Sequence, residues 1–283
     1  MKSLISFLML VLVMGVGCSK KEKAYEDRMM EEHAEDKPVA NKAWYEPEAP
    51  VDTQSVVYAK IDGKQVNGYL AQPEGAPGDA PGIIVIHEWW GLNDNVKMMT
   101  RRIAAEGYTA LAVDLYKGQV AESPEDARTY MSGVMDDMSA STENLKAAYQ
   151  YLDEQHKASK VGTIGWCFGG GMSLTAALTL PAKIDLAVIY YGRLVTDKDQ
   201  LRLLEMPVIG FFGGADQGIP VATVKEFETA LDSAGVENEI YIYKNAGHAF
   251  ANPSGNNYQK AAAEDAWYKT VEFLDYYLTD PLK

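Results

Sequence analysis

The chain has 283 residues, of which 47% are hydrophobic, enough for one large domain or two small ones with a substantial core. It carries 26 Lys and Arg against 40 Asp and Glu, for a formal net charge of −14. Nucleic-acid binding needs clustered Lys and Arg at the phosphates, and a chain this acidic is therefore a poor candidate for it. We attribute the acidity to solubility. The two cysteines, Cys18 and Cys167, allow one disulfide arithmetically.

Residues 1–17 are typical of a targeting segment. A lysine precedes the apolar run Leu4–Val16, which is too short to span a bilayer comfortably. The segment resembles a bacterial lipoprotein signal ending at Cys18, although Gly15 stands where such signals usually carry Leu. The resemblance implies that Cys18 is lipidated and anchors an exported protein, and Ser19 favours the periplasmic face of the outer membrane. An ordinary secretory signal or an uncleaved anchor is the alternative.

Residues 18–50 are polar, charged and poor in periodic apolar residues. Such a composition favours a lipidated, flexible tether between the anchor and the domain. A short helix could form near residues 25–33, but nothing in the sequence would hold it down, and His33 is expected to be solvated. A lipidated Cys18 cannot pair with Cys167, which leaves a lone thiol in an exported protein.

From about Val51 strand and helix patterns alternate to the end of the chain, which predicts one domain over residues 51–283. Asp62-Gly63 marks an antiparallel hairpin at its start, and the continuous apolar run that begins at Gly82 is typical of strands buried on both faces. The expected fold is a three-layer α/β fold with a mostly parallel central sheet. Expected strands cover 56–59, 66–70, 82–87, 109–113, 161–166, 184–191, 207–213 and 239–243, and expected helices lie near 93–107, 124–156 with a break near Ser139, 172–180, 197–204, 220–235 and 267–278.

Cys167 lies where a β-rich run meets a helix-forming run, and glycines surround it. A nucleophile at the tip of a strained strand-to-helix turn needs small residues two positions before and after it, as Gly165 and Gly169 are here. This pattern predicts a thiol nucleophile on a nucleophile elbow. A buried structural cysteine in a glycine-rich turn is the alternative.

Two more candidates follow strands of the predicted sheet. Asp216 follows the strand 207–213, and His248 follows the strand 239–243. Functional residues of such sheets sit past the carboxyl ends of the strands, and the order nucleophile, acid, histidine is that of the α/β-hydrolase fold. Asp216 could instead be an ordinary turn aspartate. His87 is a rival base, whereas His156 is expected to be solvated on a charged helix end.

Together these motifs resemble the dienelactone hydrolase family, the cysteine-dependent members of the α/β-hydrolase fold. The resemblance runs from about Val56 to Leu278. It rests on five short motifs: His87-Glu88-Trp89-Trp90-Gly91-Leu92-Asn93, Gly165-Trp166-Cys167-Phe168-Gly169-Gly170, Tyr190-Tyr191-Gly192, Gly214-Ala215-Asp216 and Ala246-Gly247-His248-Ala249-Phe250.

The resemblance also implies roles for residues around the thiol. Glu88 would hold the thiol in check until substrate arrives, and the backbone N–H groups of Trp89 and Phe168 would form the oxyanion hole. Trp90 suits an apolar substrate pocket. Arg128 could bind a substrate carboxylate, in place of one of the arginines that the family uses.

One departure concerns the substrate. The family carries an arginine four residues past the histidine, and here that position is Asn252. The carboxylate-binding pattern is therefore incomplete, and we expect a hydrolase of another ester rather than of a dienelactone.

The expected function is hydrolysis of an ester or lactone through Cys167, His248 and Asp216, with a thioester acyl-enzyme. The expected partners are a small ester or lactone substrate and, through the lipid, a membrane. We expect a monomer with no nucleic acid, cofactor or metal. One alternative is a non-catalytic binding lipoprotein on a hydrolase scaffold. Another is a redox thiol protein, which would require a second cysteine near Cys167.

Overall fold

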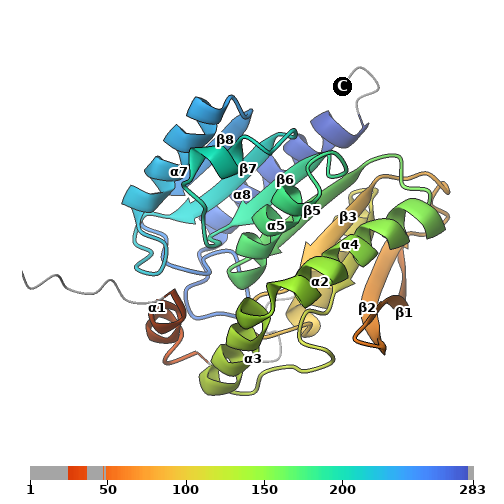
Figure 1. The fold of residues 1–283 in the computed structure, drawn as a ribbon, viewed down its shortest axis with the longest axis horizontal. Coiled ribbons are helices and arrows are strands. Elements are labelled where there is room, and N and C mark those ends of the chain that lie inside the picture. The colour runs from red at the N-terminus through yellow and green to blue at the C-terminus, as the bar shows by residue number, and fades with distance from the viewer. Residues whose placement is uncertain (1–24, 37–46, 48, 280–283) are drawn as a thin grey trace, which may run out of the picture.

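A computed structural model describes residues 25–36, 47 and 49–279 of the chain. Its centre is one eight-stranded sheet, in the order β1-β2-β4-β3-β5-β6-β7-β8 (Figure 1). β1, β2 and β4 pair antiparallel, and every pairing from β4 to β8 is parallel. The strands are β1 (Val51–Ile61), β2 (Lys64–Pro73), β3 (Gly82–Ile86), β4 (Thr109–Val113), β5 (Val161–Trp166), β6 (Leu186–Tyr190), β7 (Val208–Gly213) and β8 (Asn238–Tyr243).

Helices cover both faces of this sheet (Figure 1). α4 and α5 contact each other on one face, while α2 and α8 meet on the other, where the Arg102 guanidinium lies 3.9 Å from the centre of the Trp267 ring. The helices are α1 (Tyr25–Glu32), α2 (Asp94–Ala105), α3 (Pro124–Asp136), α4 (Met138–Gln155), α5 (Phe168–Thr179), α6 (Lys198–Leu201), α7 (Val221–Ala234) and α8 (Lys260–Leu274), which continues as a π-helical turn, Asp275–Thr279.

The sequence-based fold class is confirmed: this is an α/β-hydrolase fold with an antiparallel start and a parallel remainder. Every residue of β3, β4, β5, β6 and β7 is buried, as their continuous apolar runs predict for strands covered on both faces. Local signals bound two of the helices. The Asn93 side chain accepts from the N–H of Val96 to begin α2, and Gly235 ends α7 with a left-handed φ of 79°.

Several helix boundaries differ from the expected ones, and α8 differs most, since it begins at Lys260 instead of residue 267. The break expected near Ser139 falls at Asp137, because the Asp137 side chain accepts from the N–H of Ala140 and caps α4. α5 begins at Phe168, four residues before the expected start at Met172. The glycines that the sequence places in a turn are the first turn of this helix, so the helix begins directly after Cys167.

The largest difference lies in the segment expected as a flexible tether. Its described part contains α1, whose residues Tyr25 and Met29 are buried against the domain, and His33 just beyond it is only 3% exposed. The expectations that nothing holds this helix down and that His33 is solvated are therefore wrong. The remainder of the tether, apart from residues 47, 49 and 50, lies outside the described residues, as do the proposed targeting segment 1–17 and Cys18. Within the described ranges, no helix is long and apolar enough to cross a membrane.

Candidate active site

Cys167 lies at a sharp turn between β5 and α5, with a positive φ of 54°. A Cβ atom on Gly165 would lie 2.0 Å from the Gly169 carbonyl oxygen, and one on Gly169 would lie 2.3 Å from the Ile86 carbonyl oxygen. Only residues without a side chain allow backbone segments to approach this closely. The small neighbours that the sequence places around the thiol are thus a steric requirement, and Cys167 sits on a sharp strand-to-helix turn of the kind that they predict.

Asp216 and His248 come together past the ends of β7 and β8. His248 Nδ1 donates to Asp216 Oδ2 at 2.8 Å, and both residues are buried. The other carboxylate oxygen, Asp216 Oδ1, accepts from the backbone N–H groups of Gly218 and Ile219, each at 2.8 Å. These bonds fix the carboxylate, which in turn leaves Nε2 of His248 as the free nitrogen of the ring.

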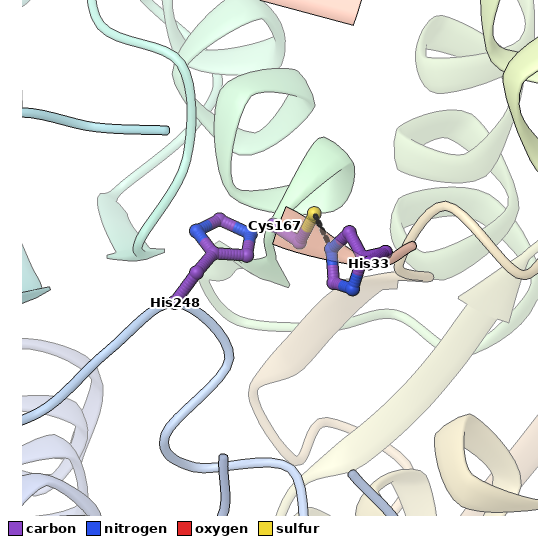
Figure 2. A group of neighbouring side chains, drawn as sticks. All are labelled: His33, Cys167 and His248. Atoms are coloured by element: carbon purple, nitrogen blue, oxygen red, sulfur yellow. Dashed lines mark hydrogen bonds between the residues drawn. The ribbon is translucent and has the colours of Figure 1, made fainter. Parts of the chain in front are cut away.

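The free nitrogen of His248 belongs to a group of atoms around the thiol. The Cys167 sulfur and the available nitrogens of His33 and His248 all lie within 4.8 Å of one another, with the sulfur between the two imidazole rings (Figure 2). Among the described residues, His248 Nε2 has no hydrogen-bond partner. It is therefore placed to exchange a proton with the thiol once the two atoms close to bonding distance.

The electrostatics of this group favour an ion pair. Burial alone would raise the pKa of the Cys167 thiol, but the positive charges of His248 and His33 outweigh burial and lower the pKa to about 6. Burial would lower the pKa of His248, yet the charges of Asp216 and of the thiolate raise that pKa well above its ordinary value. A thiolate next to an imidazolium is the reactive form of a catalytic cysteine.

α1 and the turn after it cover the thiol. The sulfur of Met29 lies 4.0 Å from Cys167 Sγ. His33 Nε2 lies 3.9 Å from the same atom, and Figure 2 shows this contact. The His33 ring also stacks on Trp89, with ring centres 4.3 Å apart, and meets the ring of His248 edge-on. Cys167 is consequently only 1% exposed, so this conformation is closed to substrate.

Polar contacts hold the cover in place on several sides. Glu32 Oε1 accepts from the backbone N–H groups of Gln217 and Gly218, at 2.8 and 3.1 Å. The Asp36 carboxylate accepts from His33 Nδ1 at 2.7 Å and from Asn256 Nδ2 at 2.9 Å. The cover therefore contacts the loop that carries Asp216 and, through Asn256, the segment that follows His248. An ion pair between Arg128 of α3 and Asp27 of α1, at 2.5 Å, also joins the cover to the domain.

Glu88 lies in the same buried cluster. Asn252 Nδ2 donates to Glu88 Oε2, while Glu88 Oε1 has no hydrogen-bond partner in the described part of the chain. Burial and the charge of Cys167 raise the pKa of Glu88 to about 8. Asn252, the residue that departs from the family pattern, therefore contacts the glutamate and is itself buried.

The remaining predicted residues fall at different distances from this centre. Trp89 and Trp90 are buried and lie against His33 and each other. Phe168 is the first residue of α5, so its N–H is one that a helix leaves without an internal acceptor. Arg128 is about half exposed, and its recorded contact is the ion pair with Asp27. It thus contacts the cover rather than the thiol.

His87, the rival base, is a structural residue. Its Nε2 accepts from the N–H of Leu115 at 3.1 Å, and its Nδ1 donates to the carbonyl of Glu88 at 2.6 Å. Both ring nitrogens are used, and burial lowers the pKa of the ring. His156, expected to be solvated, is partly buried beside Tyr151.

Sequence reasoning missed Met29 and His33 as neighbours of the thiol. Tyr25, Met29 and His33 recur every fourth residue, which places them on one face of a helix. That spacing was the available signal. It indicates a helix with a buried face, but it does not identify the surface that the face covers.

Comparison with known proteins gives a consistent result. The model of the family described as "Dienelactone hydrolase family" matches residues 66–278. "Protein usf" of Aquifex pyrophilus is 34% identical over 233 residues, covering 80% of this chain and 99% of the relative. A "Putative carboxymethylenebutenolidase" of Saccharolobus solfataricus is 31% identical over 255 residues, covering 77% and 96%.

The solved structures agree in fold. A dienelactone hydrolase-like promiscuous phosphotriesterase from metagenomic libraries superposes with a TM-score of 0.73 at 25% identity, covering 80% of this chain and 98% of that one. A dienelactone hydrolase of Anabaena variabilis has a TM-score of 0.62 at 21% identity, covering 81% and 99%.

Proposed function

This chain belongs to the dienelactone hydrolase family and is a hydrolase of that type, and from that premise we propose that it cleaves carboxylic esters or lactones through Cys167, His248 and Asp216. The observation that carries the proposal is the position of the thiol. It sits on a strained elbow, within 4.8 Å of a histidine nitrogen whose ring is held by a buried carboxylate.

The first half-reaction forms a thioester. The Cys167 thiolate attacks the ester carbonyl carbon, and the developing oxyanion accepts hydrogen bonds from the N–H groups of Phe168 and Trp89. The bond to the leaving oxygen then breaks, and the His248 imidazolium gives its proton to that oxygen. The products are an alcohol, or the ring-opened hydroxyl of a lactone, and an acyl group on sulfur.

The second half-reaction restores the enzyme. His248, now neutral, accepts a proton from a water molecule as that water attacks the thioester carbonyl. The carbon–sulfur bond breaks, the thiolate leaves, and the carboxylic acid is released. Asp216 keeps the imidazole oriented and stabilises its charged form throughout.

Glu88 supports control of the thiol in this scheme. With a pKa of about 8, the carboxyl is largely neutral near pH 7, so it adds little negative charge beside the thiolate. When the carboxyl ionises, its charge opposes the thiolate and favours a protonated thiol. The Asn252 amide donates a hydrogen bond to Oε2 of Glu88 and so fixes the position of this carboxyl.

Substrate entry requires α1 to leave. Met29 and His33 occupy the space in front of the sulfur, and a carbonyl carbon must approach to within about 3–3.5 Å of the attacking atom. Several contacts that hold the cover are polar and partly exposed, and solvent can replace such bonds, while the burial of Tyr25 and Met29 is the apolar part that opening must give up. We therefore assign the closed arrangement to the resting enzyme and an open one to turnover.

The residues around the thiol favour an uncharged substrate. Trp89, Trp90 and Phe168 provide an apolar surface, and Asn252 stands where the family resemblance implies an arginine. The described residues that bond to the Cys167 sulfur or lower the pKa of its thiol include no arginine or lysine. A neutral or apolar ester is thus the preferred substrate class over a dienelactone carboxylate.

The experiment is an ester panel read with matched variants. The wild-type chain should hydrolyse p-nitrophenyl esters, Cys167→Ala and His248→Ala should lose this activity, and His156→Ala should keep it. A panel that contains neutral and carboxylate-bearing esters of equal length tests the substrate class. If Cys167→Ala retains wild-type turnover, the thiol mechanism is wrong.

We further propose export and lipidation at Cys18, on the sequence of residues 1–19. Seven positions separate Cys18 from Tyr25, so the intervening chain reaches at most about 25 Å. A lipid on Cys18 would then keep α1, and with it the covered thiol, close to the membrane surface. Metabolic labelling with a fatty acid, lost in Cys18→Ala, is the expected result, and equal labelling of that variant would contradict it.

A further inference from the structure

Two histidines, and not one, are oriented toward the Cys167 thiol by hydrogen bonds to carboxylates. His33 and His248 come from opposite ends of the chain, yet each donates its Nδ1–H to a carboxylate, Asp36 in one case and Asp216 in the other. Both rings therefore direct the lone pair of Nε2 toward the surroundings of the same sulfur. A histidine held in this way by a carboxylate is the usual arrangement of a metal ligand.

We propose that His33, Cys167 and His248 form a binding site for a divalent cation of the zinc type. Imidazole nitrogen and thiolate sulfur are the ligands that Zn²⁺ prefers, in tetrahedral sites that often leave one position to water. All three side chains are at least 97% buried, and His248 Nε2 has no hydrogen-bond partner among the described residues. A buried polar atom without a partner is costly, and a cation would give it one.

The distances suit such a site after a small movement. Bonds of about 2.0–2.1 Å to nitrogen and about 2.3 Å to sulfur place tetrahedral ligand atoms about 3.3–3.6 Å apart. Here Cys167 Sγ and His33 Nε2 are 3.9 Å apart, and no two of the three atoms exceed 4.8 Å. His33 belongs to a turn that follows a surface helix. Its ring can therefore move toward the other two ligands without a change in the sheet.

The charges around the site also suit a cation. Asp36 and Asp216 stand behind the two imidazoles, and Glu88 lies close enough for the charges of the three ligands to act on it. Binding replaces protons with the metal: the thiol and any imidazolium release theirs to solvent, and no electron is transferred.

The site has a consequence for the reaction, and this part rests on the proposed function. The cation would occupy the sulfur and the nitrogen that hydrolysis needs, and His33 would tie the cover to both. Zn²⁺ should therefore inhibit the enzyme and hold α1 closed. The metal-binding claim itself depends only on the three ligands.

The test is a zinc titration of the full chain against a chromophoric chelator. We expect one Zn²⁺ per chain, a loss of affinity of about 10–100-fold in Asp36→Asn, which removes only the carboxylate behind His33, and larger losses in His33→Ala and Cys167→Ser. His156→Ala is the matched histidine control and should bind as the wild type does. Co²⁺ provides a second readout, because a cobalt–thiolate charge-transfer band should appear and should be absent in Cys167→Ser.

The outcomes separate the two proposals. Unchanged zinc affinity in both His33→Ala and Cys167→Ser overturns the site, as does the absence of stoichiometric binding by the wild type. Affinity lost in Cys167→Ser but kept in His33→Ala also overturns it, since His33 would not then be a ligand. Zinc binding without any ester hydrolysis would instead leave the site intact and remove the proposed function.

Discussion

The elbow that carries Cys167 and the cover that α1 places over it are held together by different kinds of contact. The elbow is built from backbone segments that touch directly, with Gly165 and Gly169 at distances that exclude a side chain. The cover is held by a few side-chain bonds, of which those of Glu32 and Asp36 are examples, and by two side chains against the sulfur.

This difference separates what must stay fixed from what must move. Close-packed backbone has no alternative arrangement of similar energy, so the turn that carries the thiol keeps one position. Side-chain bonds at a surface contribute about 1 kcal/mol each and can be exchanged for water, so the cover can leave once the burial of Tyr25 and Met29 is given up as well. The geometry needed for catalysis thus lies in the part that cannot rearrange, and access lies in the part that can.

The largest effect should come from the acid behind the base. Asp216→Asn keeps the size of the side chain but removes the charge that orients His248 and stabilises its imidazolium. We expect kcat to fall by about 10⁴-fold, from assays on a p-nitrophenyl ester. Asp199→Asn, an exposed aspartate, is the control. A loss smaller than about tenfold would mean that Asp216 is an ordinary turn residue.

The elbow is tested by adding one methyl group. Gly165→Ala places a Cβ 2.0 Å from the carbonyl oxygen of Gly169, and the strand-to-helix turn must shift to accept it. We expect the free energy of unfolding to fall by at least about 4 kcal/mol, from chemical denaturation.

Gly133→Ala is the matched control for this substitution. Gly133 lies in α3, and a Cβ atom there meets nothing within 4 Å. This variant should be more stable than the wild type by about 0.5–1 kcal/mol. Equal effects of the two substitutions would show that the elbow is not sterically constrained.

The cover is tested by removing one of its bonds. Glu32→Ala deletes an acceptor of the Gln217 and Gly218 N–H groups, while Gly218 keeps its bond to Asp216. The lost bonds are partly exposed and contribute about 1–1.5 kcal/mol. The population of the open form should rise by about five- to tenfold. Labelling of Cys167 by a thiol reagent should become faster by the same factor. Glu35→Ala removes an exposed carboxylate of the same segment and should change nothing. No difference between the two variants would contradict the role of this bond.

The smallest effect is a shift in a pH profile. The pKa of the Cys167 thiol is lowered to about 6, so the thiolate fraction rises with pH through about 6 and is nearly complete at pH 7. The thiol of an ordinary cysteine is half ionised only near pH 8.5. Alkylation of the Cys167 peptide, followed by mass spectrometry, should show the lower midpoint. In His248→Gln the positive charge is gone while burial remains, so the midpoint should rise; an unchanged midpoint would contradict this cause.

Sequence reasoning reached the fold and the elbow because their signals are local. Glycine spacing, continuous apolar strands and the residues after each strand end are written in short stretches, and parallel strands bring those ends to one edge. Cys167, Asp216 and His248 could be gathered for that reason.

The cover could not be placed in the same way. Its helix spacing is visible in Tyr25, Met29 and His33, but the surface it buries is formed by distant loops, from Trp89 to the turn at Cys167 and beyond. Charged neighbours gave the segment the composition of a tether, and composition does not report tertiary contacts. Arg128 shows the same limit, since its partner Asp27 could not be known without the fold.

The most direct test of the central claim is the identity of the acylated atom. Rapid mixing of the chain with a p-nitrophenyl ester should release a burst of one p-nitrophenolate per chain, and the acid-quenched protein should carry one acyl group on the peptide that contains Cys167. His248→Ala should form this adduct far more slowly, and Cys167→Ala should not form it. An acyl group on another residue, or a burst that persists in Cys167→Ala, would contradict the account.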